Sequence, residues 1–92
     1  MPTYELAFAV DAKKEWDALD GSVKQAFKKV LARRLEQPRV AAAKLRGADN
    51  RYKIKLRDVG YRLAYEVEDN ILTVVVIAVG RRDKVYQTLA GR

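Results

Sequence analysis

RYKIKLR, residues 51–57, alternates cationic and apolar side chains without a break and decides how this chain folds. Successive side chains of a β-strand point to opposite faces of the sheet, so one face of this strand is apolar and the other is cationic. The cationic face carries Arg51, Lys53, Lys55 and Arg57. We therefore predict a sheet with one face in the core and a basic face open to a partner.

Two further strands are predicted downstream of this segment. Residues 61–67 place Tyr61, Leu63, Tyr65 and Val67 on one face, with Arg62, Ala64 and Glu66 on the other. Residues 71–79 are apolar on both faces, which is typical of a central strand. Asp69-Asn70 between them is interpreted as a two-residue hairpin turn.

Upstream, the pattern predicts one strand over residues 4–10 and then a helical hairpin. Asp11 is expected to cap a first helix that runs to about Leu19, and Ser22 with Gln25 forms a capping box for a second helix that ends before Pro38. The apolar stripe of the second helix comprises Val23, Phe27, Val30, Leu31 and Leu35. Residues after Gly80 are expected to form a short tail.

The predicted fold is α+β in the order β-α-α-β-β-β. The helical hairpin packs on one face of a twisted, mainly antiparallel sheet, and residues 1–92 form one domain. If residues 58–61 form a four-residue loop, Lys55 faces Ala64 and Arg57 faces Arg62, with matched polarity throughout. The open face is then an apolar floor of Val75 and Ile77, bordered by cations, with Arg82 near its rim.

Composition restricts the chemistry of the chain. It has no cysteine and no histidine, so thiolate chemistry is excluded and neither a metal nor a cofactor is expected. The absence of cysteine, of a signal peptide and of a long apolar run favours the cytoplasm and no membrane partner. The net charge of +7 favours a polyanionic partner, with nucleic acid the usual one.

The basic face is the candidate site. Like cations on adjacent strands repel, and they lower the pKa of a neighbouring lysine, which can then act as a base. The grouping of Lys53, Lys55 and Arg62 favours a functional site. Arg51 and Arg57 alone are interpreted as solvated charges that keep an edge strand from aggregating. Tyr52, Tyr61 and Tyr65 are interpreted as core residues, and Tyr86 is either a packed tail residue or a stacking platform.

Further cations lie off the apolar stripe of the second helix. They are Lys24, Lys28, Lys29, Arg33 and Arg34. The pattern alone favours a solvated outer face, with binding to ribosomal RNA as the functional alternative.

Four segments in order resemble the RelE toxins of bacterial and archaeal toxin–antitoxin pairs. They are Lys44-Leu-Arg-Gly47, Tyr52-Lys-Ile-Lys-Leu-Arg57, Gly60-Tyr-Arg-Leu-Ala-Tyr65 and Val79-Gly-Arg-Arg82, and the resemblance covers nearly the whole chain. It implies a RelE-like RNase fold and cleavage of mRNA in the ribosomal A site by attack of a ribose 2′-OH on its own phosphate.

The resemblance also implies roles for individual residues. The catalytic lysines fall on Lys53 and Lys55, the phosphate-binding arginines on Arg46 and Arg62, the acid-side arginine on Arg82 and the base-stacking tyrosine on Tyr86. The segment between Arg82 and Tyr86 is shorter than in the best-known member.

We add Arg57 and Arg81, with Lys24, Lys28, Lys29 and Arg33, as RNA-binding candidates. The implied partners are a RelB-like antitoxin, the ribosome with its rRNA, and mRNA; DNA contact arises only through the antitoxin.

Two other functions remain open from the sequence. One is a ParE-like toxin of the same fold that poisons DNA gyrase, and the other is a non-catalytic module that binds nucleic acid or an antitoxin. A gyrase poison has no need for Lys53, Lys55, Arg62 and Arg82 together. The exposed floor of Val75 and Ile77 is expected to attract an antitoxin that covers it.

Overall fold

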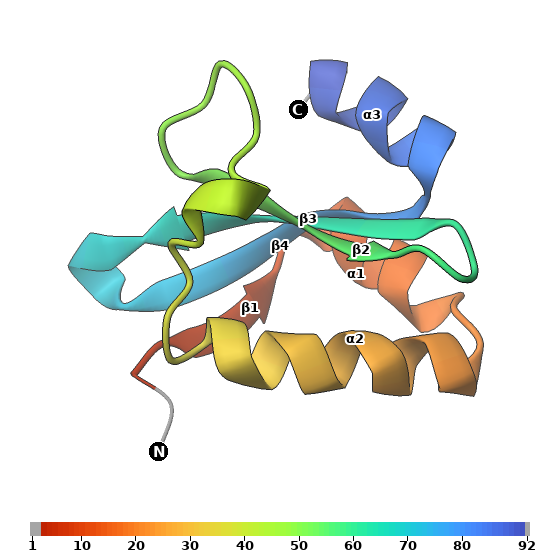
Figure 1. The fold of residues 1–92 in the computed structure, drawn as a ribbon, viewed down its shortest axis with the longest axis horizontal. Coiled ribbons are helices and arrows are strands. Elements are labelled where there is room, and N and C mark those ends of the chain that lie inside the picture. The colour runs from red at the N-terminus through yellow and green to blue at the C-terminus, as the bar shows by residue number, and fades with distance from the viewer. Residues whose placement is uncertain (1–2, 92) are drawn as a thin grey trace.

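The computed structural model describes residues 3–91 as a four-stranded sheet with helices on both faces (Figure 1). The elements are β1 (Glu5–Phe8), α1 (Val10–Asp17), α2 (Gly21–Arg34), β2 (Arg51–Leu56), β3 (Tyr61–Glu68), β4 (Thr73–Arg81) and α3 (Arg82–Gly91), with short turns η1 (Ala41–Ala43) and η2 (Asp69–Ile71). The strand order is β1-β4-β3-β2, with β1 parallel to β4 and the other two pairs antiparallel. The predicted α+β fold, with β4 as a central strand, is confirmed.

The main core lies between the helical hairpin and the sheet. Val23, Phe27 and Leu31 of α2 are buried, as predicted from their spacing. They belong to one apolar cluster with Tyr52 and Tyr65 of the sheet, whose rings stack at 5.7 Å between centroids. Burial of each large apolar side chain stabilises the fold by roughly 1.5–3 kcal/mol, so this face of the sheet is committed to the core.

Both predicted helix caps are wrong. α1 begins at Val10 after Ala9, and α2 begins at Gly21 after Asp20, without a side-chain hydrogen bond at either cap. Gly21 therefore starts α2 instead of ending α1. The apolar residues on the two helices fix how they pack, and the caps adjust to the resulting short connection.

The strand register differs from the prediction by two residues between β2 and β3. Lys55 lies opposite Arg62, and Lys53 lies opposite Ala64. The loop is residues 57–60, and Gly60 adopts a left-handed φ of 69° that lets Tyr61 join β3. A slip of two residues keeps every side chain on the same face, so polarity alone could not detect it.

The connection from β3 to β4 is longer than the predicted two-residue turn. η2 spans Asp69–Ile71, and Leu72 follows with a left-handed φ of 46°. The Asp69 carboxylate accepts hydrogen bonds from the hydroxyl of Tyr4 at 2.6 Å and from Arg39 Nη2 at 2.6 Å, which ties the turn to two distant segments.

The chain beyond Gly80 is a helix and not a short tail. Val85 and Leu89 of α3, four residues apart, pack with Leu45 and Ile77 in a second apolar cluster on the other face of the sheet (Figure 1). Ile77 is only 7% exposed and Val75 is half-buried, so the prediction of an open apolar floor is wrong. β4 is apolar on both faces because α3 covers the second one.

Candidate active site

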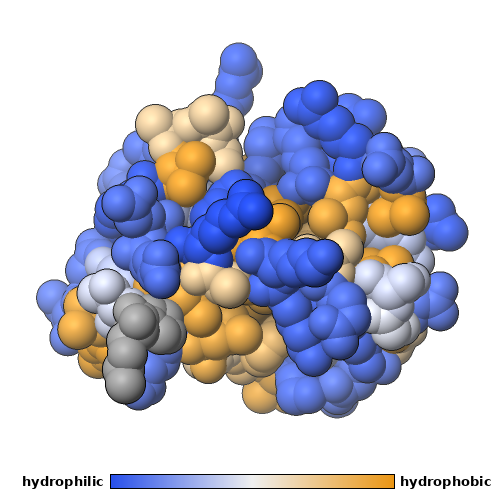
Figure 2. Space-filling model, turned by 60° about the horizontal axis from the view of Figure 1, so that its bottom comes forward, coloured by the Kyte–Doolittle hydropathy of each residue, from blue (hydrophilic) through white to orange (hydrophobic). Residues whose placement is uncertain are grey.

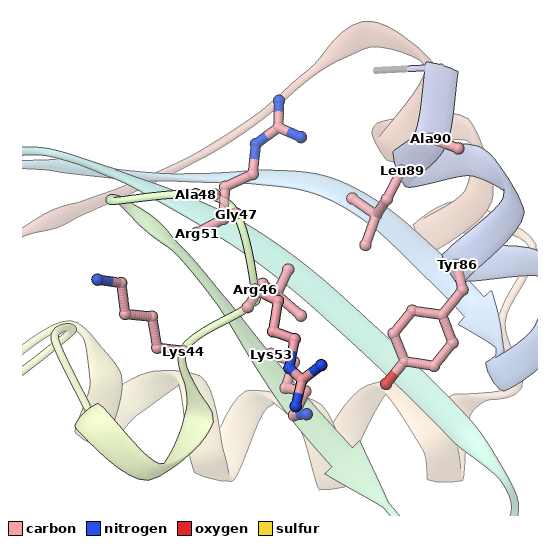
Figure 3. A pocket seen from close by; sticks show the side chains of 10 residues that line it. Lys44, Arg46, Gly47, Ala48, Arg51, Lys53, Tyr86, Leu89 and Ala90 are labelled. Carbon is pink, nitrogen blue, oxygen red and sulfur yellow. The ribbon is translucent and has the colours of Figure 1, made fainter.

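A groove of about 560 Å³ lies where the basic face of β2 meets α3 and the loop that follows η1. Arg46, Lys53 and Tyr86 line it, and their polar ends point toward the same part of the groove (Figure 3). Leu89 of α3 forms part of its apolar wall. The groove thus combines cations from a loop and a strand with an aromatic ring from a helix.

Strand pairing places the predicted cations in rows across the sheet. Lys55 lies opposite Arg62, and Arg62 lies opposite Gly80 of β4. Arg82 begins α3 two residues after Gly80 and donates its backbone N–H to the carbonyl of Gly60 at 3.1 Å. The segments that carry Lys55, Arg62 and Arg82 therefore meet at one end of the sheet.

Neighbouring positive charge changes the proton affinity of Lys55. Lys53 is the largest cause of a lowered Lys55 pKa, followed by partial desolvation and the charge of Arg57, while Tyr86 opposes the shift and Arg62 adds to it. The prediction that repulsion lowers the pKa of Lys55 is therefore confirmed in direction. A lysine in this position has more neutral amine near physiological pH than an isolated one.

Arg62 is a partly buried cation of the basic face. Its Nη1 donates to the carbonyl of Tyr61 at 3.1 Å. Its Nε is buried and, among residues 3–91, has no hydrogen-bond partner. A buried donor without a partner costs roughly 1–3 kcal/mol, a cost that an anion bound at this guanidinium would offset.

Arg34 of α2 is a residue that the sequence placed only on a solvated face. Its Nη1 donates to the carbonyl of Lys53 at 3.2 Å and to the hydroxyl of Tyr65 at 2.9 Å. The Tyr65 hydroxyl donates in turn to the carbonyl of Pro38 at 2.6 Å. These bonds brace the outer edge of β2 at the position of Lys53. The position of Arg34 on α2, next to the apolar stripe of that helix, is the feature of the sequence that could have indicated this contact.

The α3 helix presents Tyr86 to the groove. Val85 is 3% exposed and anchors the helix, whereas the adjacent Tyr86 is 39% exposed. The ring stands at the side of the groove across from Arg46 (Figure 3). Of the two interpretations of Tyr86, packed tail residue or stacking platform, this exposure favours the platform.

Other predicted RNA-binding residues lie outside the groove. Arg81 stacks over the ring of Tyr61 at 5.2 Å and lines a separate groove with Glu15. Arg57 follows the end of β2 and lines a groove that does not include Tyr86. The predicted cations of α2 are on the helix that covers the opposite face of the sheet, and the view of that side shows hydrophilic regions with apolar patches between them (Figure 2).

Two further features concern cofactors and membranes. Within residues 3–91, no group of three or more Asp, Glu, His or Cys side chains is gathered as a metal site would require. None of the helices in this range is long and apolar enough to cross a membrane.

Comparisons with known proteins identify relatives of this chain. Residues 6–86 match the family model described as the ParE toxin of the type II toxin–antitoxin system parDE. The chain is 49% identical over 81 residues to the mRNA interferase toxin RelE of Escherichia coli K12, which covers 88% of this chain and 85% of that protein.

Solved structures extend the similarity to three dimensions. A doubly substituted E. coli RelE toxin in the free state is 46% identical, with a TM-score of 0.88 over 100% of this chain and 98% of that one. The toxin chain in the intact E. coli RelBE toxin–antitoxin complex is 50% identical, with a TM-score of 0.82 over 85% of this chain and 95% of that one.

Proposed function

This chain belongs to the RelE family of toxins from type II toxin–antitoxin systems, and we propose that it cleaves mRNA in the ribosomal A site. It is the toxin of such a pair and an endoribonuclease. The observation that carries the site assignment is the row of Lys55 opposite Arg62, beside a groove lined by Lys53, Arg46 and Tyr86. With this activity, we expect the protein in the cytoplasm, where translation occurs.

The first chemical step needs a base and a stabiliser of negative charge. The neutral amine of Lys55 takes the proton of a ribose 2′-OH, and the 2′-oxygen attacks the adjacent phosphorus. Arg46, Lys53 and Arg62 hold the phosphate and stabilise the charge that develops on its oxygens, because their donors are already in place before the reaction.

The second step breaks the bond from phosphorus to the 5′-oxygen. Arg82 stabilises the negative charge on the departing oxygen, which takes up a proton from solvent, while Lys55 returns the proton it accepted to solvent. The products carry a 2′,3′-cyclic phosphate and a 5′-hydroxyl. Charge stabilisation fits arginine better than proton donation, because its pKa is so high. Tyr86 stacks on a base next to the cut and thereby positions the scissile phosphate.

The decisive experiment compares a message bound to ribosomes that have an empty A site with the same message free in solution. We expect cleavage within the A-site codon only on the ribosome, with cyclic phosphate ends. Lys14→Ala, an exposed position on α1, is the matched control and should cut normally. Equal cleavage of free and ribosome-bound message would refute dependence on the ribosome, and no cleavage of either would refute the nuclease.

Ribosome binding requires contacts beyond the groove. We assign these to cations on α2, which favour the phosphates of rRNA. They are Lys24, Lys28, Lys29 and Arg33. Reversal of Lys28, Lys29 and Arg33 to Glu should weaken binding to empty ribosomes and reduce its dependence on salt. Unchanged affinity across salt concentrations would restore the solvated-face interpretation.

A RelB-like antitoxin is the proposed protein partner. RelB complexes are known for several structural relatives, including the E. coli RelBE complex. Expression of the toxin alone should arrest growth, and co-expression of its cognate antitoxin should restore it. Normal growth at high toxin level without antitoxin would contradict both the partner and the toxicity. DNA contact is expected only through the antitoxin.

Poisoning of DNA gyrase is the second candidate, because the matching family model is described as a ParE toxin. The two functions separate in the growth assay. A nuclease leaves cut messages and loses toxicity with Lys55→Ala, whereas a gyrase poison leaves messages intact and tolerates that substitution.

A further inference from the structure

The outer edge of β2 carries two more grooves that continue from the active-site groove. The first, of about 320 Å³, is lined by Arg34, Lys53, Lys55 and Arg57. The second, of about 440 Å³, lies between Lys55 and Arg57 and the N-terminal half of α2. Lys53 borders both the active-site groove and the first edge groove, and Lys55 and Arg57 border both edge grooves. Each groove therefore shares a cationic side chain with the next, and we call the three grooves together the path.

The charge of this path favours a polyanion. The first edge groove contains four cations and no carboxylate, and its remaining lining is Val40, Ala42 and Ala43. Asp58 is the one acidic residue in the second edge groove. Arg34 is held in place by the hydroxyl of Tyr65 and the carbonyl of Lys53, so its charge is positioned before any ligand arrives.

The path has no aromatic side chain beyond the active site. Neither edge groove is lined by Tyr, Phe or Trp, whereas the active-site groove has Tyr86. Bases are held by stacking on aromatic rings, and phosphates are held by cations. The edge grooves therefore suit the sugar–phosphate backbone of a strand, without selection among bases.

One flank of α2 extends the basic path. Ser22 and Ala26 line the second edge groove. Lys29 and Arg33 follow them by seven residues each, which is two helical turns, so they stand on the same flank. Both are exposed. Lys24 lies on another flank, where its Nζ donates to the carbonyl of Asp17 at 3.3 Å.

We propose that the edge grooves and the Lys29–Arg33 flank form a track for the backbone of the substrate strand on one side of the scissile phosphate. This track rests on the proposed RNase function and assigns Lys29 and Arg33 to the message in addition to rRNA. Arg34 and Arg57 contact phosphates in the edge grooves, and Lys29 and Arg33 contact phosphates along the flank of α2. The strand crosses β2 over Lys53, from the groove beside Tyr86 to the groove beside α2.

The test measures binding of 2′-O-methyl oligoribonucleotides to the purified protein without ribosomes. Such strands cannot be cut, because the attacking hydroxyl is blocked. A strand of roughly three nucleotides fills only the active-site groove, and one of roughly nine also reaches the track. The variant is Lys29→Glu with Arg33→Glu. The control is Lys14→Glu with Lys84→Glu, which makes the same charge change at exposed residues of α1 and α3.

For the track variant we expect affinity for the long strand to fall on the order of tenfold. The salt slope of that affinity should fall by about 1.4, the value for two lost phosphate contacts on a single strand. Affinity for the short strand should stay unchanged, and the control should bind both strands normally. An equal loss of affinity for the long and short strands, or an equal loss of affinity in the variant and the control, would overturn the track.

Two other outcomes separate this proposal from its premise. Weaker binding to empty ribosomes with unchanged binding of the long strand would assign the flank to rRNA alone and overturn the track. If the unaltered protein binds neither strand and fails to cut ribosome-bound message, the proposed function itself fails.

Discussion

Replacement of Lys55 by Ala should slow single-turnover cleavage of ribosome-bound message by about 10²–10⁴-fold, the usual contribution of a general base. Lys55 is exposed at its tip, so the variant should fold normally. The measurement is the rate of product formation with toxin in excess over ribosome complexes, which isolates chemistry from product release.

The pH dependence identifies the role of Lys55. Only the neutral amine can accept a proton, so the rate should rise with pH through the Lys55 titration and then level off. The charges of Lys53 and Arg57 lower the pKa of Lys55, which moves this rise below the pH expected for an isolated lysine. Because Lys53 is the largest cause, Lys53→Met should move the rise to higher pH.

Two variants make this prediction falsifiable. Arg62→Ala should cut more slowly, because it removes stabilisation of the phosphate. Its cleavage rate should still rise with pH, because Lys55 remains as the base. Lys55→Ala should lose both the rate and the pH dependence. A Lys55→Ala protein with an unchanged pH profile would exclude Lys55 as the base and leave Lys53 or a ribosomal group.

Replacement of Tyr86 by Ala should slow cleavage by about tenfold to a hundredfold. Loss of one base–aromatic stack costs roughly 1–3 kcal/mol, and each 1.4 kcal/mol is a factor of ten. The ring is 39% exposed and α3 is anchored by Val85 and Leu89, so the fold should survive.

The control for this prediction is Tyr86→Phe, which keeps the ring and should cut at nearly the normal rate. Cleavage and thermal unfolding are measured on the same preparations. A Tyr86→Ala protein that unfolds would mark the ring as part of the core, and a loss of rate in Tyr86→Phe equal to that in Tyr86→Ala would assign the effect to the hydroxyl.

Local periodicity was enough to predict the helical hairpin on one face of the sheet, but not α3 on the other face. The two-residue alternation from Arg51 to Arg57 separates an apolar face from a basic one whatever the register, and the helical spacing of Val23, Phe27 and Leu31 places α2 on the apolar face. The same alternation gathers Lys53 and Lys55 on one face, which is why the candidate base was accessible to sequence reasoning.

The capping and turn motifs were less reliable. Ser22 with Gln25 fits a capping box, and Asp69-Asn70 fits a two-residue turn, yet neither forms. Each motif contributes on the order of 1 kcal/mol, which tertiary contacts such as those of Asp69 with Tyr4 and Arg39 readily outweigh.

By itself, the sequence determined which residues share a face and which chemistry they can perform. The tertiary structure decided which of them meet. It set Lys55 opposite Arg62, because a slip of two residues preserves polarity and only the backbone of the Gly60 turn selects the register. It also placed α3 over β4, because Ile77 and its neighbours needed cover that only long-range packing with Val85 and Leu89 supplies. Tyr86 reaches the groove as a consequence of that packing.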